Sequence, residues 1–145
     1  MSVITLATAT ALGAGTTTQA APAAPPQHFE EIFGAIVLLN VTVAAVGAGD
    51  TLDVYLQHSI DDGANFDDFV HFTQVLGNGG AKKIRASWLI YGGAPTVPLG
   101  PYLDGTLAVG VNQGPVGSTW RTKIIVVGGT AAFTFTVTME GFGEL

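Results

Sequence analysis

The feature that most constrains this chain is a period-two alternation of apolar and polar residues near its C-terminus. Within residues 132–140 the apolar positions of this pattern are Phe133, Phe135, Val137 and Met139, and they alternate with Ala132, Thr134, Thr136 and Thr138. Successive side chains of a β-strand point to opposite faces, so this run predicts a strand with one apolar face. Such a face has to be covered by a second layer of structure.

Similar short runs, separated by Gly, Pro, Asn and Asp, follow one another from Phe29 onward. The expected strands cover residues 33–46, 51–59, 66–75, 82–91, 106–111, 119–127 and 132–140. About seven or eight strands at roughly ten-residue spacing, without a helical period, are typical of a β-sandwich or jelly roll. The sequence therefore predicts an all-β fold with a single antiparallel β-sandwich. It leaves jelly-roll and Ig-like topology open, because both give the same alternation.

The charged fraction of the chain is low. Only 11% of its 145 residues are charged, compared with about 25% in an average soluble domain. The mean hydropathy of +0.45 is correspondingly high. Large apolar areas on a protein surface usually mark interfaces, so the composition predicts a subunit that packs against other subunits. A net charge of −6 with five basic residues argues against binding nucleic acid by neutralising phosphates.

Residues 1–28 differ from the rest of the chain. They contain no charged side chain, they are rich in Ala and Thr, and they end in Pro22, Pro25 and Pro26. Proline at this density disfavours helix and sheet interiors and favours an extended path. We expect two parts, an extended N-terminal arm over residues 1–28 and the β-sandwich over residues 29–145. The arm is expected to lie against a neighbouring subunit, with its own domain as the alternative.

Two segments have some membrane character. Residues 32–49 are uncharged and are long enough to approach a spanning helix. Their flanks are Glu30, Glu31 and Asp50, without the Lys or Arg expected on a cytoplasmic side, so buried strands are the favoured interpretation. The apolar start of the chain lacks the positive region of a signal peptide. We predict no membrane association.

The densest polar segment is residues 59–68, Ser-Ile-Asp-Asp-Gly-Ala-Asn-Phe-Asp-Asp. Ser59, Asp61, Gly63 and Phe66 resemble the Asp box that closes hairpin turns in sialidases and related β-proteins. In such a turn, the Ser and Asp side chains form hydrogen bonds with nearby backbone amides, and Gly supplies a positive φ. The alternative is a calcium site, since calcium takes six to eight oxygen ligands. Its ligands would come from Asp61, Asp62, Asn65, Asp67 and Asp68. The structural turn is favoured.

Other residues that carry chemistry elsewhere fall in no recognisable constellation. The histidines, which lack metal-ligand spacing, are His28, His58 and His71. His58 and His71 flank the predicted hairpin, which brings them within possible reach of each other across strands. Ser59, Ser87 and Ser118 lie in no nucleophile-elbow context. With no catalytic set, we predict that the chain is not an enzyme and has no cofactor or metal.

Two further groups have both a structural and a functional interpretation. Trp88 and Trp120 fit a sugar-binding platform, as in a secreted carbohydrate-binding module, but a Trp in an alternating strand is more often part of the core. Lys82, Lys83 and Arg85 fit either a contact with an acidic loop on a neighbour or a solvated strand edge.

Two stretches together resemble small β-sandwich virion proteins encoded among the head and tail genes of tailed bacteriophages. The first runs Leu-Asp-Val-Tyr-Leu-Gln-His-Ser over residues 52–59, continues with Asp61-Asp62-Gly63 and Phe66-Asp67-Asp68, and reaches Phe-Thr-Gln-Val at 72–75. The second is Trp-Arg-Thr-Lys-Ile-Ile-Val-Val-Gly-Gly-Thr over 120–130, followed by Phe-Thr-Phe-Thr-Val at 133–137. The resemblance covers about residues 50–140. Phe66 stands where Trp is usual, and the proline-containing loop at 92–104 departs from the pattern.

This resemblance implies a structural virion protein, and most specifically a capsid decoration, or cement, protein. It would be made in the host cytoplasm and bind the capsid exterior, with the major capsid protein or other virion subunits as partners. Homo-oligomers are implied as well, since trimers at local threefold axes are typical of such proteins. A tail, neck or capsid-forming subunit is the alternative within the same class.

Overall fold

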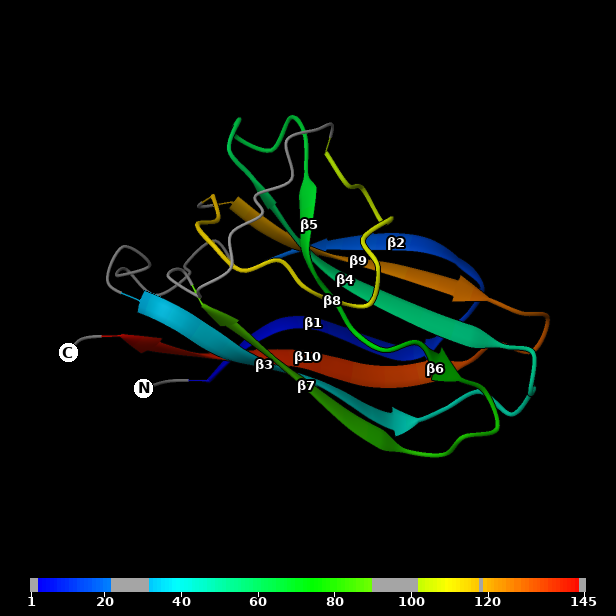
Figure 1. The fold of residues 1–145 in the computed structure, drawn as a ribbon. Helices are drawn as coiled ribbons and strands as arrows, with labels where there is room; N and C mark the ends of the chain where they lie inside the picture. Colours follow the sequence, from blue (N-terminus) through cyan, green and yellow to red (C-terminus); the bar gives the residue numbers. More distant parts are fainter. Residues whose placement is uncertain (1–2, 22–31, 90–101, 118, 144–145) are drawn as a thin grey trace.

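The computed structural model describes residues 3–21, 32–89, 102–117 and 119–143, which form β-strands and no helix (Figure 1). The ten strands are β1 (Val3–Leu12), β2 (Gly15–Ala20), β3 (Ile32–Val43), β4 (Thr51–Ser59), β5 (Asp67–His71), β6 (Val75–Leu76), β7 (Lys82–Leu89), β8 (Gly110–Val111), β9 (Thr119–Val127) and β10 (Phe133–Gly143). The all-β prediction is confirmed. In these residues no helix is long and apolar enough to cross a membrane, and the apolar segment from residue 32 forms β3.

The strands form two antiparallel sheets. The first sheet has the order β1-β10-β3-β7 and the second has the order β2-β9-β4-β5-β8, with β6 paired to β4. The pairings are nested along the chain, since β1 pairs with β10, β2 with β9, β3 with β7 and β4 with β5. A chain folded back on itself in this way and divided between two sheets is a jelly roll. The topology left open by the sequence is therefore a jelly roll rather than an Ig-like fold.

The core lies between the two sheets and follows from the alternation of the strands. On β10 the inward side chains Phe133, Phe135, Val137 and Met139 are all at most 1% exposed. The facing residues of the second sheet include Leu52, Val54 and Leu56 on β4, which are equally buried. Burying these side chains removes their apolar surface from water, and this is the main favourable contribution to folding.

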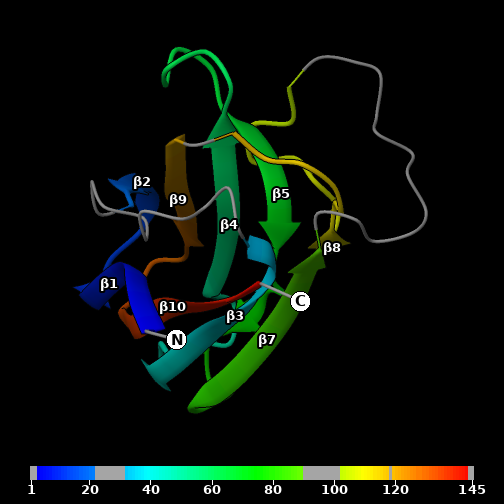
Figure 2. The same cartoon turned by 90° about the vertical axis from the view of Figure 1, so that its left-hand side faces the viewer.

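The N-terminal segment is part of the sandwich, where the sequence led us to expect an arm lying on a neighbouring subunit. β1 pairs with β10 at one edge of the first sheet, and β2 pairs with β9 at the same side of the second sheet (Figure 2). The side chain of Gln19 joins the two edges. Its Nε2 donates to Thr8 O at 2.7 Å, and its Oε1 accepts from Thr8 N–H at 3.0 Å. Pro22, Pro25 and Pro26 lie outside the described residues.

The other predicted strands are found with two differences. The strand expected over 66–75 is divided into β5 and β6, and the one expected over 106–111 is reduced to Gly110–Val111. Residues 103–107 instead form a loop that is hydrogen-bonded to side chains of the second sheet. Most of the predicted proline-containing loop at 92–104 lies outside the described residues.

Candidate functional site

The turn between β4 and β5 is closed by the side chains of Ser59 and Asp61. Ser59 Oγ donates to Asp61 Oδ1 at 2.6 Å and accepts from Gly63 N–H at 2.9 Å. Asp61 also accepts from Asn65, through its backbone N–H at 2.9 Å and its side-chain Nδ2 at 2.8 Å. Asp62 and Gly63 have φ angles of 56° and 87°, a region that glycine adopts without strain and that Asp tolerates. This is the hydrogen bonding expected of an Asp-box turn.

These hydrogen bonds also determine the ionisation of Asp61. The bonds from Ser59 and then from Asn65 stabilise the carboxylate and lower its pKa from 3.8 to about 2. The side chain therefore remains charged at neutral pH and well into the acidic range.

Phe66 ends this turn and contacts the second sheet. The guanidinium carbon of Arg121, on β9, lies 3.8 Å from the centroid of the Phe66 ring. A cation over an aromatic face at this distance is attracted by the electrons of the ring. The contact joins the hairpin to β9, and it assigns Phe66 the role of anchoring the turn.

The five residues of the alternative calcium site do not converge. Asp61 and Asn65 bond to each other within the turn, whereas Asp67 and Asp68 are on β5 and bond to the 103–107 loop. No group of three or more His, Cys, Asp or Glu in the described part of the chain is placed to hold a metal ion. The densest polar segment, residues 59–68, thus holds the favoured turn around Asp61 and, separately, the two carboxylates of β5 with partners in the 103–107 loop.

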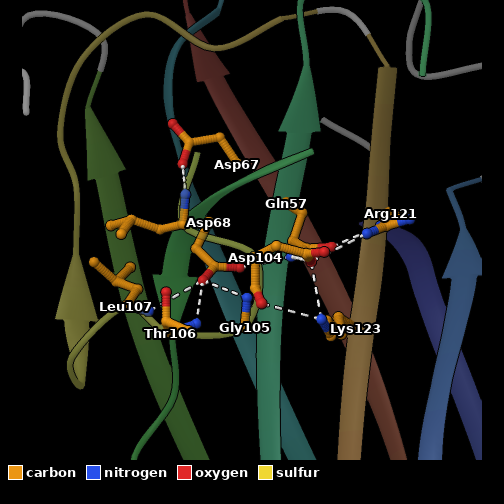
Figure 3. A network of polar contacts seen from close by, with 10 residues as sticks. Gln57, Asp67, Asp68, Asp104, Gly105, Thr106, Leu107, Arg121 and Lys123 are labelled. Carbon is orange, nitrogen blue, oxygen red and sulfur yellow. Dashed lines mark hydrogen bonds and ion pairs between the residues drawn. The ribbon is translucent and has the colours of Figure 1, made fainter. Parts of the chain in front are cut away.

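Asp68 holds the 103–107 loop against the outer face of the second sheet (Figure 3). Its Oδ2 accepts three successive backbone N–H groups, from Gly105 at 2.8 Å, Thr106 at 2.9 Å and Leu107 at 3.1 Å. Its Oδ1 accepts from Gln57 Nε2 at 2.7 Å. Because Asp68 is only 1% exposed, these four donors replace the water that its carboxylate loses on folding.

A second carboxylate, Asp104, extends this network across the sheet (Figure 3). Its Oδ1 accepts from Gln57 Nε2 at 2.8 Å and pairs with Lys123 at 2.9 Å and Arg121 at 3.2 Å. The hydrogen bond from Gln57, followed by the bond and charge of Lys123, lowers the pKa of Asp104. Arg121 Nε also donates to Gln57 Oε1 at 2.6 Å. The fully buried Gln57 is therefore the common partner of both carboxylates and Arg121.

The two histidines of the described chain do not meet. His71 stacks on Tyr55 with ring centroids 4.0 Å apart, and its nitrogens face Leu107 O at 2.7 Å and Asp53 Oδ1 at 3.0 Å. His58 lies on the core side, where its Nδ1 accepts from Gly117 N–H at 2.9 Å and burial lowers its pKa. The sequence allowed His58 and His71 to approach across strands, but they point to opposite faces of the second sheet. His28 lies outside the described residues.

Both tryptophans belong to the core. Trp88 is 1% exposed and Trp120 is 6% exposed, and their rings meet edge to face with centroids 5.8 Å apart. Phe69 packs edge to face against each of them. Trp88 Nε1 donates to Gly114 O at 3.0 Å, and Trp120 Nε1 donates to Gly117 O at 2.6 Å. The core interpretation is confirmed, and the sugar-platform alternative is wrong because neither ring faces solvent.

The polar network is a set of residues that sequence reasoning missed. Gln57, Arg121 and Lys123 appeared only as parts of the family pattern, and Asp104 was not singled out. One signal was present, because Arg121 and Lys123 are two residues apart on a predicted strand and so share a face. The partner loop at 103–107 gave no such signal. Every buried side-chain nitrogen and oxygen in the described residues has a hydrogen-bond partner, so the network acts as a rigid framework for the loop and the hairpin.

No protein-family model matches the chain, and no curated protein matches it. Among solved structures, a chain of the cryo-EM structure of Broad Bean Stain Virus is similar at 14% identity with a TM-score of 0.40, over 75% of this chain and 54% of that chain. This chain thus spans about half the length of that one. The jelly-roll assignment comes from the strand pairing itself.

Proposed function

We propose that the chain is a structural protein of a tailed-bacteriophage virion, a decoration protein that binds the exterior of the head shell. It acts by subunit contacts and not as an enzyme. The observation that best supports this proposal is that the two sequence stretches of the resemblance lie side by side as paired strands. β4 and β9 are neighbours in register, and Arg121 of the second stretch donates to Gln57 of the first at 2.6 Å. A pattern whose distant parts bond to each other is more specific than two separate runs of strand-like sequence.

The outer face of the first sheet supports a role in packing. Most side chains that point outward there are neutral. They are Thr5 and Thr8 on β1, Thr134, Thr136 and Thr138 on β10, and Ile36, Leu38 and Asn40 on β3, whereas Glu140 on β10 and Lys83 and Arg85 on the edge strand β7 are charged. Ile36 is 47% exposed and Val3, at the edge, is 62% exposed. Aliphatic and hydroxyl groups lose less on leaving water than charged groups do, so such a face is suited to burial against another subunit.

Decoration proteins stabilise a shell by binding its assembled form. Each copy that buries about 800 Å² of its own surface at a junction of capsid subunits adds contacts that opening the shell must break. The jelly roll is a rigid body for this purpose, and it occurs in viral capsid proteins as well as in lectins and cupins. The fold alone therefore does not select the function, and the proposal depends on the sequence pattern.

The test is the copy number of the chain in virions purified from the phage that encodes it. Quantitative mass spectrometry should find it in amounts comparable to the major capsid protein, and mild protease or biotin labelling of intact particles should reach it. A copy number as low as that of neck or tail-tip proteins would favour the alternative tail or neck subunit. Absence from purified virions would reject both.

A further inference from the structure

β7 is an edge strand, and residues 113 and 114 hydrogen-bond to the outer edge of its C-terminal half. It lies at the end of the first sheet, beyond β3 (Figures 1 and 2). Gln113 bonds to its backbone, with Nε2 donating to Ser87 O at 3.1 Å and Oε1 accepting from Leu89 N–H. Gly114 N–H donates to Leu89 O at 2.9 Å. Ser87 and Leu89 therefore turn their backbone groups away from β3.

The alternation of a strand extends this observation to Lys83 and Arg85. Along an edge strand, residues bonded to the neighbouring strand alternate with residues whose N–H and C=O point outward. Since Ser87 and Leu89 point outward, Arg85 and Lys83 do so too, and their registered partners Leu38 and Asn40 form the non-bonded pairs. Within the described residues, no group covers these four backbone donors and acceptors. Among the described residues, this half of the edge therefore has no hydrogen-bonded neighbour on its outer side.

The same half of the edge carries most of the positive charge of the molecule. Of the five Lys and Arg in the chain, Arg121 and Lys123 are paired with Asp104. The other three, Lys82, Lys83 and Arg85, are exposed on β7. The chain as a whole has a net charge of −6, so this is a basic strip on an acidic protein. Two copies joined through β7 would place these like charges near each other, which disfavours a second copy as the occupant.

We propose that residues 82–86 of β7 dock an extended acidic segment of another protein, which adds to the first sheet as a further strand. Its backbone would bond the outward groups of Lys83 and Arg85, and carboxylates at alternate positions would face their side chains. The edge lysines have a second effect, since pairing with a basic strand would bring like charges together and pairing with a neutral strand would desolvate the lysines without a partner. This deepens the proposed function by giving the chemistry of the partner, and it depends on that function only for the source of the segment.

Binding can be measured with the full-length chain labelled with ¹⁵N. The probes are two seven-residue peptides of alternating pattern, Thr-Glu-Val-Glu-Val-Glu-Thr and its counterpart with Lys in place of Glu. The acidic peptide should shift the amide resonances of residues 82–86, and its affinity should fall at least tenfold between low and high salt. The Lys peptide should produce no shift there. The K83E/R85E variant should reverse this preference, and that reversal would itself show that the variant is folded.

A matched pair of variants separates strand addition from simple charge attraction. Arg85→Ala removes the charge and keeps the outward N–H, whereas Arg85→Pro removes both without disturbing the bonds to β3. The Pro variant should bind the acidic peptide at least tenfold more weakly than the Ala variant. Thr18→Glu, on the edge strand β2 of the other sheet, should leave binding unchanged.

Several outcomes would overturn the inference. These are equal binding by the Ala and Pro variants, shifts located elsewhere, or equally tight binding at residues 82–86 by a single-stranded oligonucleotide of the same charge. Concentration-dependent shifts at residues 82–86 without any peptide would also overturn it, since they would indicate a second copy as the occupant. Failure of peptide binding together with a high virion copy number would reject this inference alone. Peptide binding at residues 82–86 together with absence of the chain from purified virions would reject the proposed function alone.

Discussion

At the scale of single residues, the carboxylate of Asp68 is the buried group that depends most on hydrogen-bond donors from the rest of the fold. It is buried on the outer side of the second sheet, and four hydrogen-bond donors surround it. Three of these donors are the successive backbone N–H groups of residues 105–107, so one side chain sets the path of this part of the loop, while Asp67 Oδ1 accepts from Leu103 N–H. A carboxylate can accept all four bonds because neither of its oxygens carries a hydrogen, so both act only as acceptors.

Asp68→Asn should destabilise the fold although its shape is nearly the same. The amide has one oxygen in place of two, so either the backbone donors or Gln57 Nε2 would face an NH₂ group and lose a partner. We expect a loss of about 2–3 kcal/mol in the free energy of unfolding, measured by urea denaturation with tryptophan fluorescence. Asp62→Asn, on an exposed turn residue, is the control and should change stability by less than about 0.5 kcal/mol. Equal effects of the two substitutions would contradict the role given to Asp68.

The Asp61 turn should depend on pH in a defined window. The pKa of Asp61 is lowered from 3.8 to about 2 in the folded chain, so its charged form is the one that folding favours. The contribution is fully present above about pH 3.8 and is lost as the pH falls through about 2. A ¹³C-carboxyl NMR titration should find the low pKa, and amide exchange at Gly63 and Asn65 should accelerate below it. Asp61→Asn should abolish this dependence, whereas an unshifted Asp61 pKa would refute the assignment.

The residues of the turn were predictable and those of the network were not, for a physical reason. Ser59, Asp61, Gly63 and Phe66 interact within eight positions of sequence, so their spacing records their contacts. Gln57 and Asp104 are 47 positions apart and meet only because the jelly roll brings the loop onto β4. Nothing local in the sequence specifies such a contact. The calcium alternative arose from the same limit, since adjacent carboxylates were assumed to share a site.

At the scale of elements, the predicted strands were found best where alternation was strong. β4 and β9 begin and end where expected, because large apolar side chains alternate along both. β1 and β2 were missed, because many of their inward positions hold small or polar residues, such as Ala7, Ala9, Thr17 and Gln19, between the apolar Ile4, Leu6 and Leu12. An alternation of Ala with Thr has the period of a strand but little contrast in hydropathy. The prolines that follow strengthened the interpretation as an arm.

Gln19 should contribute to holding β1 and β2 together. Its amide mimics a strand partner by both donating to and accepting from the backbone of Thr8. Gln19→Ala should lower the free energy of unfolding by about 1 kcal/mol and accelerate amide exchange at Thr8. Thr18→Ala, on the outward face of the same strand, should leave the exchange of Thr8 unchanged. Unaltered exchange in the Gln19 variant would show that the bond is not maintained in solution.

At the scale of the whole molecule, the nested pairing makes the two ends of the chain depend on each other. β1 and β10 pair along one sheet, and β2 and β9 pair along the other, so residues 3–20 complete one side of both sheets. Leu6 and Ala7 on β1 are buried in the core. Without these strands, the side chains of β10 and β9 that face the core would lose their cover on that side. The segment then acts as part of the fold before any role in assembly.

Removing residues 1–21 should therefore unfold the domain and not merely dissociate an assembly. We expect the truncated chain to lose its cooperative urea transition and to show tryptophan emission shifted to the red, because Trp88 and Trp120 would become solvated. A peptide of residues 1–21 added in excess should restore part of the native signal by supplying the missing strands. Circular dichroism and light scattering on the same samples separate unfolding from dissociation. A truncated chain that stays folded with an unchanged midpoint, but has a lower mass in solution, would instead assign the segment to contacts between subunits.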